Sequence, residues 1–111
     1  MRWSDVVRLA TRWPEVAEAT SYGEPSLKVR GRLLARHRPG DDSLVLLDVP
    51  PEERDHLIEV TPGAFFREPH YDGHAIVLAR LAQAPPDTVA RLLERRWRRL
   101  ASRRAVAAFD G

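Results

Sequence analysis

The chain has 111 residues, of which 43% are hydrophobic and 31% charged, and this composition predicts one globular domain spanning 1–111. It contains no cysteine, which excludes disulfides and thiolate chemistry, and its apolar runs are too short for a membrane span. The formal net charge is +2, with Lys28 as the sole lysine among 18 basic residues. We expect a cytoplasmic monomer without a cofactor.

The first predicted helix begins after Ser4, a residue type that favours N-caps, and carries an apolar stripe from Val6 to Trp13. Pro14 ends or restarts this helix, because its ring clashes with the preceding turn. Glu15–Ala19 are expected to form a short additional turn.

A basic hairpin follows over residues 20–38. Gly and Pro predict a turn in Tyr22–Pro25, and apolar and basic residues then alternate in Leu27–Arg30, as in a half-buried strand. A two-residue turn at Arg30-Gly31 would place Leu27 opposite Leu34 in the core and leave Lys28 and Arg30 on the outer face. A register slip by one residue would reverse the facing of one strand.

The remaining pattern alternates strands and helices. The predicted elements are a turn at Pro39–Asp42, a strand at Ser43–Val49, a helix from Pro51 to Thr61, a short strand at Phe65-Phe66, an irregular turn at Glu68–Gly73, a strand at His74–Leu81, and a last helix after Pro85-Pro86. Residues 106–109 either continue that helix or lie back on the sheet. The order α-β-β-β-α-β-β-α predicts an α+β fold: a two-layer antiparallel sheet with helices on one face.

Several motifs resemble the MmcQ/YjbR family. They are T-S-Y-G-E-P-S-L-K-V-R-G-R-L-L-A at 20–35, P-E-E-R-D at 51–55, F-F-R-E-P-H-Y-D-G-H at 65–74, V-L-A-R-L at 77–81 and the closing Arg-rich helix with Trp97. The resemblance covers roughly residues 3–110. It implies a small "double wing" α+β fold, similar to secretion chaperones, and DNA binding. Leu27 and Leu34 stand where the family often has Phe, and Pro50 where it often has Asp.

Charge is segregated along the chain, which can create a positive face at low net charge. Segment 27–38 has five cations and no acid, whereas 41–59 has seven acids and one Arg. The predicted nucleic-acid-binding residues are Lys28, Arg30, Arg32, Arg36, Arg38, Arg91, Arg95, Arg98, Arg99 and Arg103. Two alternatives stay open. One is a different anionic partner, and the other is a solvated surface with local pairs, such as Arg91 with Asp87 and Arg98 with Glu94.

A second candidate site is a ligand pocket formed by Tyr22, His70, Tyr71 and His74, whose side chains can donate, accept and stack. The alternative is that these residues brace the turns against the sheet. A metal site is not expected, because the two histidines flank a Gly turn and need not share a face.

Other conspicuous residues are assigned to structure. His37 and His56 are interpreted as isolated surface residues, and Trp3, Trp13 and Trp97 as core residues. No G-x-S-x-G elbow or phosphate-binding Gly loop is present. The predicted function is therefore non-enzymatic DNA or RNA binding of low sequence specificity. The alternative is a protein- or small-ligand-binding module.

Overall fold

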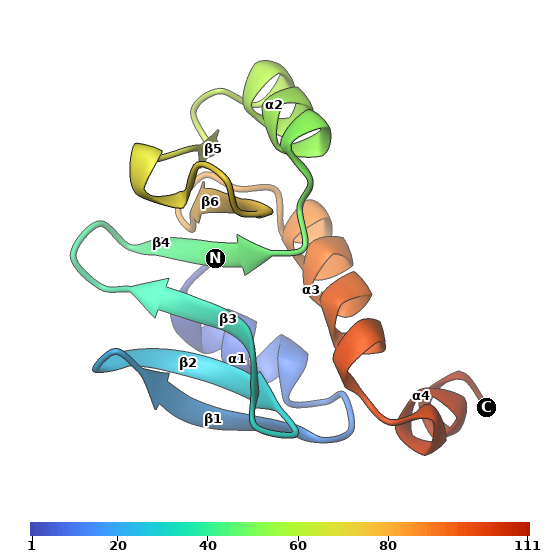
Figure 1. The fold of residues 1–111 in the computed structure, drawn as a ribbon. Helices are drawn as coiled ribbons and strands as arrows, with labels where there is room; N and C mark the ends of the chain where they lie inside the picture. Colours follow the sequence, from blue (N-terminus) through green and yellow to red (C-terminus); the bar gives the residue numbers. More distant parts are fainter.

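The computed structural model describes residues 1–111 and contains one six-stranded antiparallel sheet with the strand order β1-β2-β3-β4-β6-β5 (Figure 1). The strands are β1 Val16–Ser21, β2 Glu24–Val29, β3 Arg32–Arg38, β4 Ser43–Leu47, β5 Phe65–Phe66 and β6 Ile76–Arg80. The helices are α1 Trp3–Ala10, α2 Pro51–Val60, the 3-10 turn η1 Pro69–Tyr71, α3 Pro86–Leu100 and α4 Arg103–Asp110. These elements confirm the predicted α+β class. None of the helices has the length and apolarity needed to cross a membrane.

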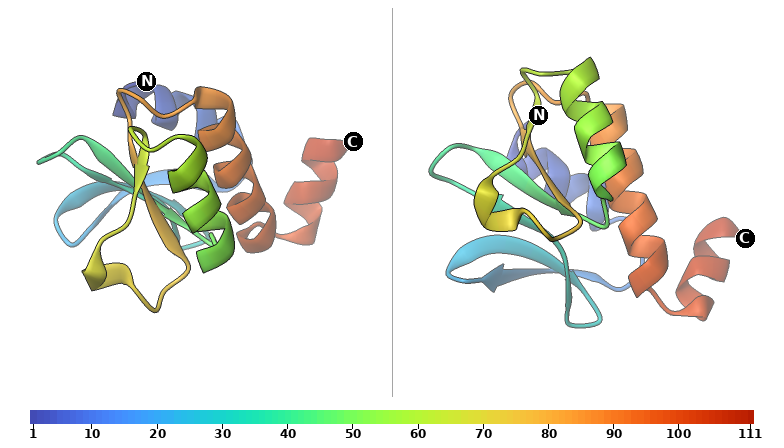
Figure 2. Two further views of the ribbon diagram at one scale, coloured as in Figure 1. Left: turned by 90° about the horizontal axis from the view of Figure 1, so that it is seen from above. Right: turned by 45° about the horizontal axis from the view of Figure 1, so that its top comes forward.

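Helices α1 and α3 cover one face of the sheet, whereas η1 lies on the other side (Figure 2). The core forms between the sheet and these two helices, in a cluster of 22 buried residues. Trp97 of α3 is fully buried and stacks on Trp13 with ring centroids 5.8 Å apart. The Trp97 indole N–H also donates to the Pro14 carbonyl at 2.9 Å, so the chain after α1 is fixed to α3. Trp13 and Trp97 are therefore core residues, as predicted.

The prediction of an extra helical turn at Glu15–Ala19 is wrong, because strand β1 begins at Val16. Glu15 has a φ of +68°, a left-handed conformation that a right-handed helix cannot continue through. The chain then pairs with β2 from Val16↔Val29 to Ser21↔Glu24. Pairing with a neighbouring strand has overridden the helical preference of Ala and Glu.

The β2–β3 hairpin has the predicted two-residue turn but a different register. Arg30 and Gly31 have φ values of +53° and +82°, as in a type I′ turn. Val29 pairs with Arg32 and Lys28 with Leu33, but Leu27 then pairs with Ala35, so Leu34 is the extra residue of a β-bulge. The prediction that Leu27 lies opposite Leu34 is therefore wrong, although both side chains are fully buried.

The helix boundaries show which local sequence signals predict the start of a helix correctly. Helix α2 begins at Pro51, as predicted from proline at the first helical position, whereas α3 begins at Pro86 and not after it. The proposed N-cap at Ser4 is wrong, because α1 begins at Trp3 and the Asp5 carboxylate accepts a hydrogen bond from the Arg2 N–H at 2.8 Å. Residues 106–109 neither extend α3 nor return to the sheet. They belong to α4, which Ser102 caps by accepting from the Ala105 N–H at 3.1 Å.

The prediction for His37 is also wrong. His37 is not an isolated surface residue, since only 13% of its side chain is exposed. Its ring stacks on Trp3 of α1 at 5.2 Å with an interplanar angle of 7°, and Nε2 lies 2.9 Å from an Asp42 carboxylate oxygen. Trp3 is half-buried and packs against the core, and His56 is exposed as predicted.

Candidate functional site

The ten predicted nucleic-acid-binding residues divide into two groups. Six of them have acidic partners within the molecule: Arg36, Arg38, Arg91, Arg95, Arg98 and Arg99. The other four, Lys28, Arg30, Arg32 and Arg103, make no ion pair. Because a cation that already holds a carboxylate gains less from a phosphate, the division separates most of the arginines that stabilise the fold from those available to a ligand. Arg91 is the exception, because its contact with Glu53 is long, at 3.6 Å, and its side chain is 56% exposed.

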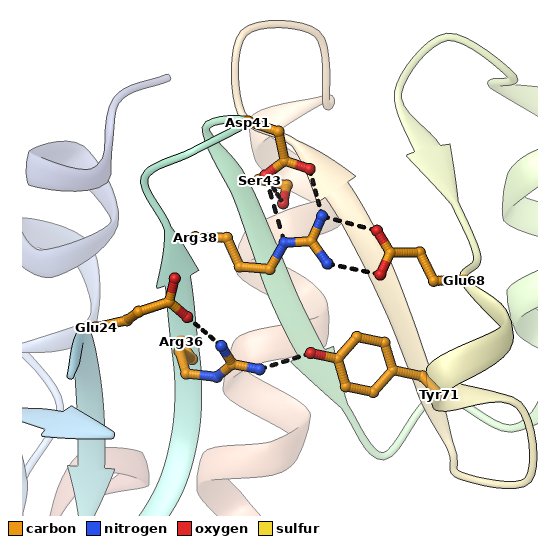
Figure 3. Close-up of polar contacts among 7 residues, drawn as sticks. All are labelled: Glu24, Arg36, Arg38, Asp41, Ser43, Glu68 and Tyr71. Atoms are coloured by element: carbon orange, nitrogen blue, oxygen red, sulfur yellow. Dashed lines mark hydrogen bonds and ion pairs between the residues drawn. The ribbon is translucent and has the colours of Figure 1, made fainter. Parts of the chain in front are cut away.

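Arg36 and Arg38 are held in a polar network on the sheet face that η1 overlies (Figure 3). Arg36 donates to the Glu24 carboxylate and, at 2.6 Å, to the Tyr71 hydroxyl. Arg38 donates to Asp41 and to both oxygens of Glu68, at 2.8 and 2.9 Å. The Arg38 guanidinium lowers the pKa of the Glu68 carboxyl below its ordinary value. This network attaches the segment around η1 to β3.

On α3, Arg91 and Arg95 bind α2 and the loop that precedes it. Arg95 donates to both oxygens of Glu53, at 2.6 and 2.9 Å, and to the Asp48 carbonyl at 2.9 Å. These hydrogen bonds lower the pKa of Glu53. Arg91 also contacts Glu53, at 3.6 Å, so its predicted partner Asp87 is wrong. Arg98 pairs with Glu94 at 3.0 Å, as the alternative interpretation predicted, and also with Asp110 at 2.7 Å.

Arg96 is a structural residue that the sequence did not single out. Its guanidinium donates twice to the Leu33 carbonyl, at 2.7 and 3.1 Å, and once to Asp48 at 2.8 Å. Leu33 directly precedes the bulged Leu34. Asp48 has a φ of +63°, and its second carboxylate oxygen lies 2.5 Å from Arg99. No spacing rule indicates this clamp, because Leu33 and Asp48 lie 63 and 48 residues from Arg96 along the chain.

Five cations without an ion pair lie at one end of the molecule, which we call the basic end: Lys28, Arg30, Arg32, Arg103 and Arg104. The first three belong to the β2–β3 turn and its flanks, and the last two begin α4. Glu15 connects these two elements. Its carboxylate accepts hydrogen bonds from the Ser102 N–H and hydroxyl, both at 2.8 Å. These bonds are the main cause of the lowered pKa of Glu15, and the charge of Arg30 also lowers it. Figure 1 shows the turn and α4 at the same end. Lys28 is half-buried, and the four arginines are exposed. Arg2, Arg12 and Arg80 also lack an ion pair but lie outside the basic end.

The structure brings together only three of the four residues of the second predicted site. The Arg36 guanidinium lies 5.8 Å from the Tyr22 ring centroid and binds Tyr71, while His70 packs edge-on against Tyr71 at 4.9 Å. His74 is exposed and makes none of these contacts. Neither groove of the molecule includes any of the four residues. No three His, Asp or Glu side chains are arranged to hold a metal ion.

Two grooves lie on the surface beside the helices. The larger has a volume of about 610 Å³ and lies among α1, α3 and α4. The smaller, about 490 Å³, has no hydrophobic lining residue and is built around the Asp48 and Glu53 ion pairs described above.

Comparisons with known proteins find a match to one family and no match to a solved structure. The YjbR family model matches residues 11–99. The chain is 29% identical over 124 residues to uncharacterized proteins from Mycobacterium tuberculosis and Mycobacterium bovis, an alignment that covers 96% of this chain and 94% of each relative. No solved structure matches the chain.

Proposed function

The chain belongs to the YjbR family, also called MmcQ/YjbR, and from this premise we propose that it binds DNA or RNA through its basic end. The binding is non-enzymatic and has low sequence specificity. The observation that carries the proposal is that five cations without an acidic partner, from two separate elements, lie at one end of the molecule.

Electrostatics favours an external anion at this place. Arg103 and Arg104 occupy the first turn of α4, which contains no acidic residue. A cation at a helix N-terminus opposes the helix dipole at a cost of about 0.3–1 kcal/mol, so neither arginine is explained by helix stability. The nearby Glu15 carboxylate is already engaged by Ser102. A phosphate group would satisfy both arginines and the helix N-terminus.

The hairpin supplies a rigid support for the remaining cations. Its type I′ turn fixes Arg30 at the tip, and Arg32 is exposed at the start of β3. Arg96 braces the strand behind them through the Leu33 carbonyl. Arginines on a fixed turn contact phosphates without a large ordering cost, but they present no arrangement for reading base edges. Affinity from such contacts is independent of sequence and falls with salt.

A salt titration tests the proposal. Binding of a labelled DNA duplex is measured by fluorescence anisotropy at several salt concentrations for the unaltered protein and for R32E/R103E. Each lost phosphate contact lowers the slope of log affinity against log salt by about 0.9, so the double variant should lose about 1.8 units of slope. The Arg103→Glu change places a carboxylate favourably at the α4 N-terminus, and Arg32 is exposed, so the fold should persist.

The matched control is R2E/R80E, which changes the net charge equally. Both arginines are exposed and have no acidic partner. Arg80 is the last residue of β6. Arg2 follows Met1, whose amino group donates to the Leu81 carbonyl, and the Leu81 N–H donates to the Asp42 carbonyl in the β3–β4 turn. Arg2 therefore lies near that turn. The control should keep the parental slope. Equal losses in both variants would show a non-specific charge effect and contradict the proposed interface.

A second candidate function, a protein-binding module, is supported by Tyr22. This aromatic residue is 93% exposed and has a φ of +54°, a conformation that costs energy for a side chain of this size. Tyr is enriched among residues that dominate protein interfaces. Partners that remain bound after nuclease treatment and are lost with Tyr22→Ala would favour this function. Retention of every nuclease-resistant partner by that variant would reject it.

A further inference from the structure

The larger groove has an aromatic wall and a basic rim. We call it the α3 groove; α1 and the chain after it supply Leu9, Arg12 and Trp13, α4 supplies Phe109, and α3 supplies the opposite wall. Its volume of about 610 Å³ falls within the range of small-ligand pockets. Phe109 is 42% exposed although it packs edge-on against Trp97, with ring centroids 5.1 Å apart. An apolar ring thus remains accessible inside a concave surface.

Ion pairs hold α4 against this groove. Arg98 donates to both oxygens of Asp110, at 2.7 and 2.9 Å, and its guanidinium lies 5.7 Å from the Phe109 ring centroid. Ser102 is bound to Glu15 at the other end of the helix. These contacts, formed at both ends of α4, position the exposed Phe109 ring beside a cation.

The rim has cations available for a ligand. Arg12 is exposed and has no ion pair, and Arg91 is 56% exposed with a long contact of 3.6 Å to Glu53. Of the two acids that line the groove, Glu94 is occupied by Arg98 at 3.0 Å, which leaves only Asp87 without a cationic partner. The charge and the aromatic wall therefore suit an anion that carries a flat apolar group.

We propose that the α3 groove holds an unpaired base of single-stranded nucleic acid against Phe109, with flanking phosphates on Arg12 and Arg91. This inference rests on the proposed function and specifies its substrate class. Single-strand-binding proteins combine a basic groove with aromatic side chains on which bases stack. Arg12 lies three residues before Glu15, which is bound to Ser102 beside Arg103, so the groove adjoins the basic end and one strand can contact both.

The smaller groove does not suit the same ligand. Its lining has no hydrophobic residue, and Asp48, Glu52 and Glu53 place three carboxylates there. Its arginines already hold two of these acids. A base would find no stacking surface in it, and phosphates would meet like charges.

The test compares an intact single-stranded oligonucleotide with an abasic oligonucleotide of the same length, which keeps the phosphates and lacks the bases. Anisotropy at low salt gives both affinities for the unaltered protein. Stacking of one base predicts about 5- to 140-fold tighter binding of the intact strand. Phe109→Leu, which keeps an apolar side chain but removes the ring, should reduce this ratio to near one. Tyr22→Leu, the same change at an exposed aromatic outside the groove, should leave it unchanged.

The outcomes separate this inference from the proposed function. Equal binding of intact and abasic strands, or an unchanged ratio in Phe109→Leu, overturns base stacking in the α3 groove and leaves phosphate binding at the basic end in place. Failure of the unaltered protein to bind any strand or duplex at low salt overturns both. Because the abasic comparison uses the unaltered protein, it can refute base stacking even if α4 does not tolerate the substitution.

Discussion

Replacing Arg96 with methionine should destabilise the fold strongly, although arginine is usually a surface residue. Only 13% of the Arg96 side chain is exposed, and the substitution removes both of its hydrogen bonds to the Leu33 carbonyl and its bond to Asp48. A buried carbonyl without a partner costs about 1–3 kcal/mol, and a hydrogen bond to a charged group contributes about 1.5–3 kcal/mol. Asp48 keeps Arg99, which is 66% exposed. We therefore expect a loss of about 2–3 kcal/mol.

Urea unfolding followed by tryptophan fluorescence measures this loss, with Arg91→Met as the control on the same helix. Arg91 is 56% exposed and its ion pair is long, so its replacement should cost below about 1 kcal/mol. The Arg96→Met transition should move to lower urea with an unchanged slope, and the melting temperature should fall by roughly 10 °C. Equal effects of the two substitutions, or a loss below about 0.5 kcal/mol for Arg96→Met, would refute the assignment of Arg96 as a structural clamp.

Three further predictions concern the core and its ion pairs. Trp97→Phe removes the donor to the Pro14 carbonyl from a fully buried site and should cost about 2–3 kcal/mol in chemical unfolding; a loss below about 1 kcal/mol would contradict the packing described. Ser26→Ala should raise the free energy of unfolding by about 1 kcal/mol, because the buried Ser26 hydroxyl has no hydrogen-bond partner; a clear decrease in melting temperature would show that the hydroxyl is satisfied. Glu53→Gln should be destabilising at pH 7 but progressively less so below its ordinary pKa of 4.5, because the bonds from Arg95 lower the folded-state pKa and their stabilisation is lost as the carboxyl is protonated. Urea midpoints at pH 7 and pH 3 measure this difference, and a constant gap would contradict it.

The sequence predicted elements whose signals are local. Examples are the Arg30-Gly31 turn, the proline at the start of α2 and the apolar stripe around Trp97. Each signal lies within a few residues of the structure it determines. Strand β1 was missed because its sequence, V-A-E-A-T-S, includes Ala and Glu and becomes extended only by pairing with β2. The bulge at Leu34 was missed for a similar reason, since the carbonyl of the preceding Leu33 is held by Arg96, 63 residues away.

The candidate site could be predicted only as a set of charges. Of the ion pairs that involve the predicted arginines, the local pair Arg98–Glu94 was anticipated from helical spacing. The Glu68 partner of Arg38 and the Glu53 partner of Arg95 lie 30 and 42 residues away, and no spacing rule connects them. The α3 groove likewise requires three helices from both ends of the chain. Sequence therefore located the cations but not which of them are free.

The most direct measurement of the central claim is an NMR titration of the labelled protein with a short oligonucleotide at low salt. We expect the largest backbone amide shifts in residues 28–32 and 102–104, which contain the five cations of the basic end. Smaller changes are expected around Arg36 and Arg38, whose guanidinium groups are held by Glu24 and Glu68. Shifts centred on those paired arginines, or no shifts at all, would contradict the account.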